Sequence, residues 1–234
     1  MIRTAGTRGI EVPGLEEAIR ATLFADDTTT YLSEHDNFKL VQNVLDMWCS
    51  ASRAKFNISK TEIIPIGTKS FREQVVKHYK ETGTWNGLPQ QAKLAEDGEA
   101  IRLLGAYVGN KVNNDHVWEA KIAKVEETLE RWSKHHTTIS GKRYAIQMVV
   151  GGLTQFLADV QSLPKTSIQK LEKAIRKYIW GENRIPPVKM EQLYMPWTSG
   201  GLGILDLQAR NEAINIMWLR SYLMTDEQRP TWAF

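Results

Sequence analysis

The spacing of apolar residues changes along this chain of 234 residues, and the change limits the folds available to it. Up to about Asn110, short β-rich runs alternate with amphipathic and polar segments. From Asn114 onwards, apolar residues recur at the 3.6-residue spacing of a helix. The sequence therefore predicts an α+β fold, with strands and helices in residues 1–112 and a mostly α-helical region in residues 113–234.

The first part contains three β-rich runs. In "ATLFADDTTTYL", Ala21–Phe24 and Thr28–Leu32 flank two adjacent aspartates, which predicts a hairpin. Glu62–Ile66 is typical of a short strand, and its proline indicates an edge or a strand end. Ile101–Asn110 predicts a hairpin or a bent strand. The polar residues 68–100 between these runs carry mixed signals, so they are interpreted as an insertion.

Five helices are predicted, and three of them have a candidate capping residue. Asp36 is expected to cap a helix that runs to about Ala51, while Asp115 and Ser167 are expected to cap two later helices. The helices that Asp115 and Ser167 would cap are expected over about 115–132 and 167–180. Two further helices are expected over about 142–160 and 213–222.

Basic residues are concentrated in one part of the chain. The formal net charge is only +3, but residues 133–189 hold ten Lys or Arg against three acids, which leaves −4 for the rest. A polyanion such as nucleic acid would be attracted to this span. A solvated helical surface is the alternative interpretation of the same charges.

The composition indicates a globular protein and limits its possible disulfides, metal sites and cellular location. Hydrophobic residues make up 42% of the chain and charged residues 24%, as in globular proteins. The single cysteine, Cys49, excludes an internal disulfide and a multi-cysteine zinc site. No apolar run is long enough to cross a bilayer and no signal peptide is apparent, so we expect no membrane association and an intracellular location, nuclear or cytoplasmic.

The pair Asp26–Asp27 has two possible roles. Adjacent aspartates at a hairpin tip are usually a solvated turn. Carboxylates are also the ligands that Mg²⁺ prefers, together with substrate phosphates, and two such ions can clamp an in-line phosphoryl transfer. Lys60, just before the second predicted strand, could neutralise phosphate charge or donate a proton, or it could simply solubilise the surface.

The order of several short motifs resembles the reverse transcriptases of non-LTR (LINE-like) retrotransposons. The series begins with "LFADDTTTYL", an amphipathic helix, "FNISKTEIIPIG" and "LLGAYVGN". It continues with "LERWSKHHTTISGKRYAIQMVV", "LPKTSIQKLEKAIRKYIWGE" and "GGLGILDLQARNEAI". The similarity covers about Gly9 to Leu223.

This resemblance implies roles for particular residues. Asp26 and Asp27 would be catalytic palm residues that bind Mg²⁺ or Mn²⁺, with Asp26 the more direct ligand, and Lys60 would be an acid or a phosphate contact. Leu104 and Gly105 would form the primer grip. The basic span would be a thumb that follows the backbone of an RNA template–DNA primer duplex, with these nucleic-acid-binding residues: Lys142, Arg143, Lys173 and Lys177.

The resemblance also implies that parts of such an enzyme are missing. The family needs another aspartate upstream, and no aspartate precedes Asp26 here. Fingers, nucleotide pocket and endonuclease are not apparent either. We therefore expect a truncated palm sheet with an Asp-Asp hairpin, weak metal binding, and no polymerase activity unless an N-terminal half is supplied.

Two alternatives to a polymerase fragment remain open. The chain could be a basic nucleic-acid-binding module without chemistry, or a relic without function. As an element fragment, it would be either a truncated copy or an incomplete gene product.

Overall fold

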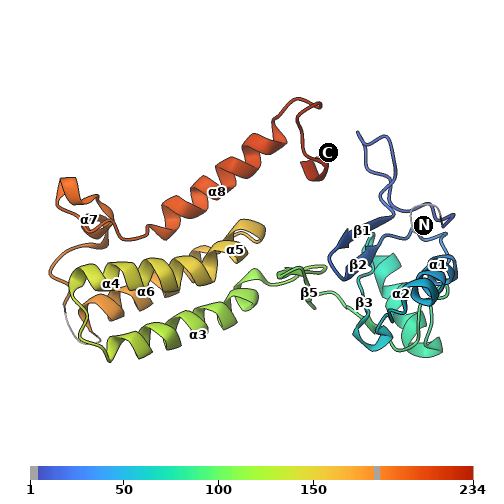
Figure 1. The fold of residues 1–234 in the computed structure, drawn as a ribbon, viewed down its shortest axis with the longest axis horizontal. Coiled ribbons are helices and arrows are strands. Elements are labelled where there is room, and N and C mark those ends of the chain that lie inside the picture. Colours follow the sequence, from blue (N-terminus) through green and yellow to red (C-terminus); the bar gives the residue numbers. More distant parts are fainter. Residues whose placement is uncertain (1–4, 182–184, 234) are drawn as a thin grey trace. The chain divides into compact units, whose positions relative to one another are not determined.

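A computed structural model describes residues 5–181 and 185–233 of the chain. It divides them into two compact units. Unit 1 is formed within residues 1–101, 109–111 and 221–234, and unit 2 within 102–108 and 112–220. The fold is α+β, with far more helix than strand (Figure 1). The interpretation of the two parts as palm and thumb stays a prediction.

Unit 1 contains short strands and two helices. Its strands are β1 (Ala21–Phe24), β2 (Asp27–Thr30), β3 (Glu62–Ile63) and β4 (Lys93–Leu94), and its helices are α1 (Phe38–Ser52) and α2 (Lys69–Thr82). Strands β1 and β2 pair antiparallel, while β3 and β4 pair parallel. β3 stops at Ile63, short of the predicted Ile66, because Pro65 cannot donate to a ladder.

Unit 2 is a helical bundle preceded by a small hairpin. The hairpin consists of β5 (Ile101–Leu103) and β6 (Ala106–Val108), as predicted for this run. The helices are α3 (Asn114–Ser133), α4 (Ile139–Ile146), α5 (Gly152–Val160), α6 (Lys165–Trp180), α7 (Met190–Tyr194) and α8 (Leu207–Tyr222). A π-helical segment, Gln147–Gly151, joins α4 to α5 without a break, so the predicted helix of 142–160 exists but contains a bulge.

The strands form three separate two-stranded sheets in the described part of the chain. The strands are two to four residues long, which leaves each pair with few backbone hydrogen bonds. An isolated pair of strands is marginally stable, so each depends on its neighbours in the same unit.

The main hydrophobic core lies in unit 2. Helix α3 packs along α6, and the α4–α5 helix contacts α3. The residues that are almost inaccessible to solvent come from these helices and from the first residue of α8: Trp118, Val125, Ile146, Val150, Leu157, Leu171, Ile175 and Leu207. The core thus follows the helical stripes that the sequence shows.

The three predicted helix caps are wrong, and each is displaced by a nearby residue. Asn37 caps α1 and Asn113 caps α3, each accepting the N–H two residues on. Helix α6 begins at Lys165, directly after Pro164, so Ser167 lies within its first turn and is buried. Asp36 has a different role, described below.

The predicted polar insertion of residues 68–100 contains a regular helix. Thr68 caps α2 by accepting the Phe71 N–H, and Gly83 ends it in a left-handed conformation. Val75 and Tyr79 are its buried residues. The Thr cap, the four-residue apolar spacing and the terminal glycine were all signals that the sequence carried.

Candidate functional site

The two aspartates lie at the tip of the β1–β2 hairpin, as the sequence predicted. Phe24 pairs with Asp27 in the ladder, so the turn consists of Ala25 and Asp26 alone. Ala25 has a φ of 52°, in the left-handed region that alanine rarely adopts. Two-residue hairpin turns require such a conformation, which fixes the direction in which the chain leaves β1.

The carboxylates of Asp26 and Asp27 are open to solvent. Both residues are exposed, and no hydrogen bond or ion pair joins either side chain to another described residue. The neighbouring Leu23 and Phe24 are also 68% and 65% exposed. The hairpin tip therefore presents two unpaired carboxylates beside an uncovered apolar surface.

Lys60 lies at the end of a 3₁₀ turn, Ile58–Lys60, and Thr61 separates it from β3. The residue is exposed, and it makes no ion pair with Asp26 or Asp27 among the described residues. The structure therefore does not join Lys60 to the aspartates, and its role stays a prediction.

The predicted primer-grip residues form another two-residue turn. Leu104 and Gly105 connect β5 to β6 with φ angles of 49° and 88°. A β-carbon on Gly105 would lie 2.8 Å from Cε1 of Phe156 on α5. The Gln161 side chain holds β6 to the end of α5, since it accepts the Tyr107 N–H and donates to the Tyr107 carbonyl. This turn belongs to unit 2, whereas the aspartates and Lys60 belong to unit 1.

The four predicted nucleic-acid-binding residues fall into two groups. The Lys142 amine donates to the Ile179 carbonyl at 2.7 Å, and Nε of Arg143 donates to the Gly203 carbonyl at 3.3 Å. Both side chains are half-buried and support the bundle from within unit 2. Lys173 and Lys177, in contrast, are exposed on α6.

The outer face of α6 is basic. Four exposed cations recur there at helical spacing: Lys170, Lys173, Arg176 and Lys177. The only acid in the helix, Glu172, accepts a hydrogen bond from the Tyr194 hydroxyl at 3.1 Å. Burial, and then this carboxylate, raise the pKa of the Tyr194 hydroxyl above its ordinary value. Two other members of the basic span, Glu182 and Arg184, lie outside the described residues.

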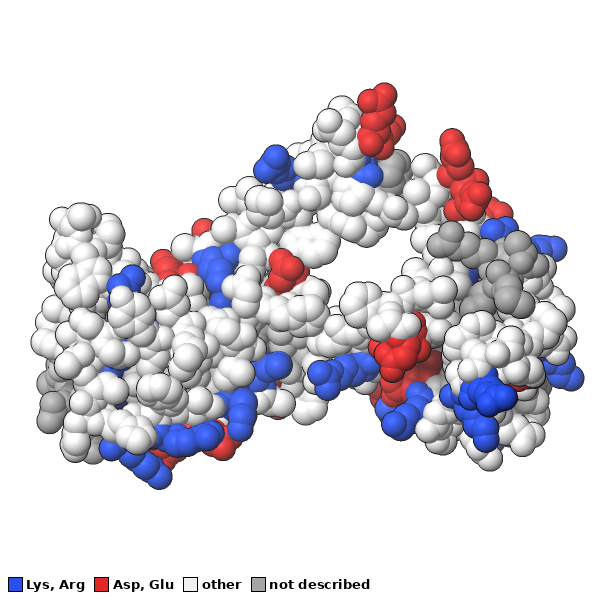
Figure 2. All heavy atoms as spheres, in the orientation of Figure 1, with Lys and Arg blue, Asp and Glu red and all other residues white. Residues whose placement is uncertain are grey.

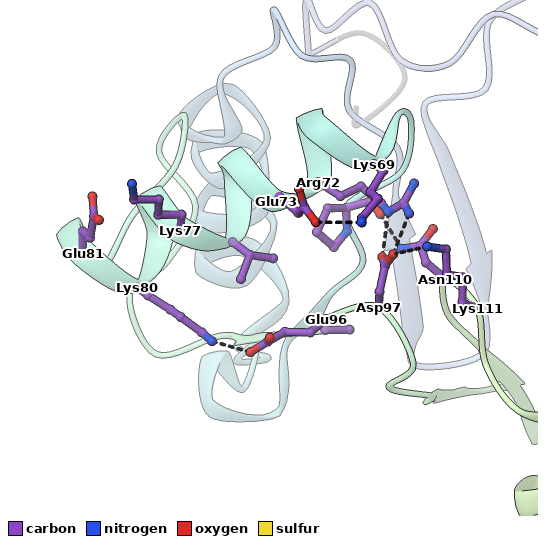
Figure 3. Close-up of a pocket in the computed structure, with 13 residues that line it drawn as sticks. Lys69, Arg72, Glu73, Lys77, Lys80, Glu81, Glu96, Asp97, Asn110 and Lys111 are labelled. Atoms are coloured by element: carbon purple, nitrogen blue, oxygen red, sulfur yellow. Dashed lines mark hydrogen bonds and ion pairs between the residues drawn. The ribbon is translucent and has the colours of Figure 1, made fainter.

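A pocket of about 570 Å³ lies on α2 in unit 1, at a place the sequence did not indicate (Figure 3). Arg72 donates two hydrogen bonds to Asp97 at 2.8 and 2.7 Å, and the Lys111 amine lies 3.4 Å from the same carboxylate. The Arg72 guanidinium holds the pKa of Asp97 at about 2. Most of the pocket's charges are therefore compensated within the protein, which leaves little attraction for a charged ligand.

Asp36 is the acidic residue with the strongest internal role. Its carboxylate accepts backbone N–H groups of Arg8 at 2.8 Å, Gly9 at 3.0 Å and Ser33 at 2.8 Å. The residue is only 6% exposed. Burial alone would raise the pKa of Asp36, but these three hydrogen bonds outweigh it and lower the pKa. Asp36 thus joins the N-terminal segment to the loop before α1.

A metal ion would find two carboxylate ligands at the hairpin tip. Asp26 and Asp27 fit a hard cation such as Mg²⁺, which commonly binds one or two carboxylates and completes its shell with water and phosphates. No group of three or more acidic, histidine or cysteine side chains that could hold a metal occurs among the described residues.

Comparisons with known proteins add no relative. No protein-family model matches this chain, and no curated protein matches it significantly. No helix in the described ranges is long and apolar enough to cross a membrane.

Proposed function

We propose that this chain forms part of an RNA-directed DNA polymerase of the non-LTR retrotransposon type, with the β1–β2 hairpin as its metal-binding element. The observation that supports this most is the tight turn that holds Asp26 and Asp27 exposed and without protein partners. If Asp26 or Asp27 formed an ion pair with a cationic side chain of the protein, a structural role would be favoured, as it is for Asp97 in its ion pair with Arg72.

The chemistry assigned to this site is nucleotidyl transfer. A divalent ion bound there would stabilise charge on the phosphate oxygens. Asp26 and Asp27 would supply ligand oxygens, and the turn would hold them at a fixed separation. Lys60 would neutralise charge on phosphate. Leu104 and Gly105 would contact the primer strand, because the Leu104 side chain is exposed at this tight turn.

Two carboxylates are fewer than this chemistry uses in the family that the sequence resembles. The proposal therefore requires a further carboxylate ligand, which the N-terminal half of such an enzyme would supply. Asp26 and Asp27 without that ligand are not expected to support primer extension.

Complementation in trans tests this proposal. The chain is mixed with the N-terminal half of a non-LTR reverse transcriptase, Mg²⁺ and a primed RNA template, and primer extension is measured. Extension should appear with the unchanged chain and fall at least ~100-fold with Asp26→Asn, because a ligand oxygen is lost. Glu17→Gln, which removes one exposed charge elsewhere in unit 1, is the matched control. Extension that is absent, or insensitive to Asp26→Asn, would refute the assignment.

The outer face of α6 favours a second candidate, a nucleic-acid-binding module without chemistry. Four exposed cations lie on this face, and duplex backbones are recognised by such charges without regard to sequence. Each phosphate contact contributes about 0.9 to the slope of log affinity against log salt concentration.

Salt titration of duplex binding tests this candidate. The double variant Lys170→Glu/Lys173→Glu should lower the slope by about 2, because two phosphate contacts are lost. Its control, Lys55→Glu/Lys77→Glu, reverses two exposed charges in unit 1 and should leave the slope unchanged. Equal slopes for the two double variants would exclude the α6 face as the contact surface.

A further inference from the structure

One segment of unit 1 carries cations without any acid. It runs from Trp48, near the end of α1, to Lys60, at the end of the 3₁₀ turn that precedes β3, and it also contains Arg53 and Lys55. The three cations are exposed, and none of them forms an ion pair with another described residue. Because the segment holds no acid of its own, it attracts an anionic ligand.

Positive charge alone does not single out this segment. In the view of Figure 2, Lys and Arg side chains are scattered over the surface, and acids lie among them. The segment differs in that two of its cations, Arg53 and Lys55, stand in the sequence between two exposed aromatic residues, Trp48 and Phe56. The chemistry of the aromatic rings therefore decides which anion fits.

The two rings contact each other and stay open to solvent. The centroids of the Trp48 and Phe56 rings lie 5.6 Å apart, with an angle of 47° between their planes. The two residues are nevertheless 45% and 38% exposed. The Nε1–H of Trp48 has no acceptor among the described residues. The pair therefore offers ring surface and one free hydrogen-bond donor to a ligand.

The loop after α1 turns so that the rings meet. Arg53 follows α1 in a left-handed conformation with a φ of 60°, which residues other than glycine rarely adopt. The loop then brings Phe56 against Trp48, eight residues earlier. The unfavourable conformation of Arg53 is thus part of the geometry that holds the rings together, and it puts Arg53 and Lys55 on the connecting loop.

Polar groups next to Phe56 favour nucleic acid over a lipid surface. Asn57 and Ser59 are exposed, and the Ser59 hydroxyl donates to the Asn57 side-chain oxygen at 2.7 Å. Insertion of Phe56 into a bilayer would bury these groups at the cost of their hydration. Base edges and sugar hydroxyls would instead offer them hydrogen-bond partners.

We propose that the Trp48–Lys60 segment binds single-stranded nucleic acid, with bases stacked on Trp48 and Phe56 and backbone phosphates held by Arg53 and Lys55. A duplex does not fit this site, because its bases stack on one another and do not offer their faces to protein rings. The site is separate from the α6 face, which belongs to unit 2. The proposal does not depend on the polymerase assignment, in which Lys60 has a separate role.

Binding of a labelled oligothymidylate strand tests the role of the rings. All variants are made in the Lys170→Glu/Lys173→Glu background, so that the α6 face contributes little. Fluorescence anisotropy should show that Trp48→Leu and Phe56→Leu each weaken binding at least ~5-fold, because leucine stays apolar but offers no ring for stacking. Phe56→Tyr keeps a ring and should bind within about twofold of the background chain.

The matched control is Trp197→Leu, which removes a tryptophan of unit 2 that is 55% exposed. It should leave the affinity for the strand within about twofold. Circular dichroism checks that the variants keep their helix content. Equal effects of Trp48→Leu and Trp197→Leu, or equal losses with Phe56→Leu and Phe56→Tyr, would overturn the stacking role.

Salt titration with the same strand tests the two cations. Arg53→Gln/Lys55→Gln should reduce the slope of log affinity against log salt concentration by about 1.4, since each phosphate contact on a single strand contributes about 0.7. Lys77→Gln/Arg102→Gln neutralises two exposed cations elsewhere and should leave the slope unchanged. An unchanged slope for the first double variant, or the same fall in both, would overturn the phosphate contacts.

A duplex and a lipid surface are the competing occupants of the segment. Trp48→Leu and Phe56→Leu should leave duplex affinity within about twofold, because the faces of paired bases are covered. They should also leave unchanged any binding to vesicles of phosphatidylserine and phosphatidylcholine. If either variant loses duplex or vesicle binding but keeps its affinity for the single strand, that ligand is the occupant and the proposal fails.

Discussion

Asp36 connects two segments of unit 1 through one carboxylate. Its carboxylate oxygens accept hydrogen bonds from the backbone N–H groups of Arg8, 28 residues earlier, and Gly9, 27 residues earlier. They also accept one from the N–H of nearby Ser33. Three donors stabilise the ionised form, so its pKa falls below the ordinary value of 3.8 despite burial. Because the folded state favours the ionised form, Asp36 stabilises unit 1 above pH 4. That contribution is lost as pH falls through the lowered pKa.

Replacing this residue should destabilise unit 1. Asp36→Asn keeps the size of the side chain but puts an amide donor opposite backbone donors, at an expected cost of about 1–3 kcal/mol in the free energy of unfolding. Urea denaturation at pH 7 measures the loss. Between pH 5 and pH 2 the gap between the variant and the unchanged chain should narrow, since the aspartate itself becomes protonated. A gap that widens in acid would contradict the assigned role.

At the scale of elements, the two hairpin turns have the same length but different surroundings. Both are two residues long and both contain a residue with positive φ that is not glycine, Ala25 in one and Leu104 in the other. The β1–β2 turn is exposed. The β5–β6 turn lies against α5, where Gly105 leaves room for the Phe156 ring.

The packing of the β5–β6 turn against α5 predicts how replacing Gly105 by alanine changes the stability of unit 2. Gly105→Ala should lower the stability of unit 2 by about 1–2 kcal/mol, because alanine is strained at a φ of 88° and its β-carbon would press on Phe156. The control is Gly200→Ala, at a φ of 80° with no atom within 4 Å, which should cost about 1 kcal/mol from backbone strain alone. Thermal unfolding compares the two. A smaller loss at Gly105 than at Gly200 would refute the packing argument.

At the scale of the whole molecule, stability is distributed unevenly between the two units. The large hydrophobic cluster is confined to unit 2, from Val117 to Ile214. Unit 1 buries fewer large side chains, chiefly Val41, Val75 and Tyr79. Its β1–β2 hairpin leaves Leu23 and Phe24 exposed.

Hydrogen exchange should therefore separate the units. Amides of α3 and α6 are expected to exchange slowest, by global unfolding of unit 2, while amides of β1 and β2 exchange through local opening at least ~100-fold faster. Mass spectrometry of peptides from the exchanged chain measures both. Equal protection of the hairpin and the bundle would mean that the two units unfold as one.

The sequence by itself determined the elements whose causes are local. The antiparallel hairpin around Asp26 and Asp27 follows from β-rich runs on both sides of a polar turn, and the helices of unit 2 follow from apolar stripes of regular spacing. The helix in residues 68–100 was not predicted, although its causes are also local: a Thr68 cap, buried Val75 and Tyr79, and Gly83 at its end. The general α+β character was predicted for the same reason.

Only the tertiary structure decided what each polar side chain contacts. Lys142 and Lys173 are both lysines in a basic span, yet one donates to a helix carbonyl and the other faces solvent. Asp36 binds residues that precede it by 27 or more positions, instead of the helix that follows. Spacing along a chain fixes which residues share a face, whereas partners distant in sequence are fixed by how the faces pack. The carboxylates of Asp26 and Asp27 show the same dependence on packing. They are unpaired because no described residue makes a hydrogen bond or ion pair with them.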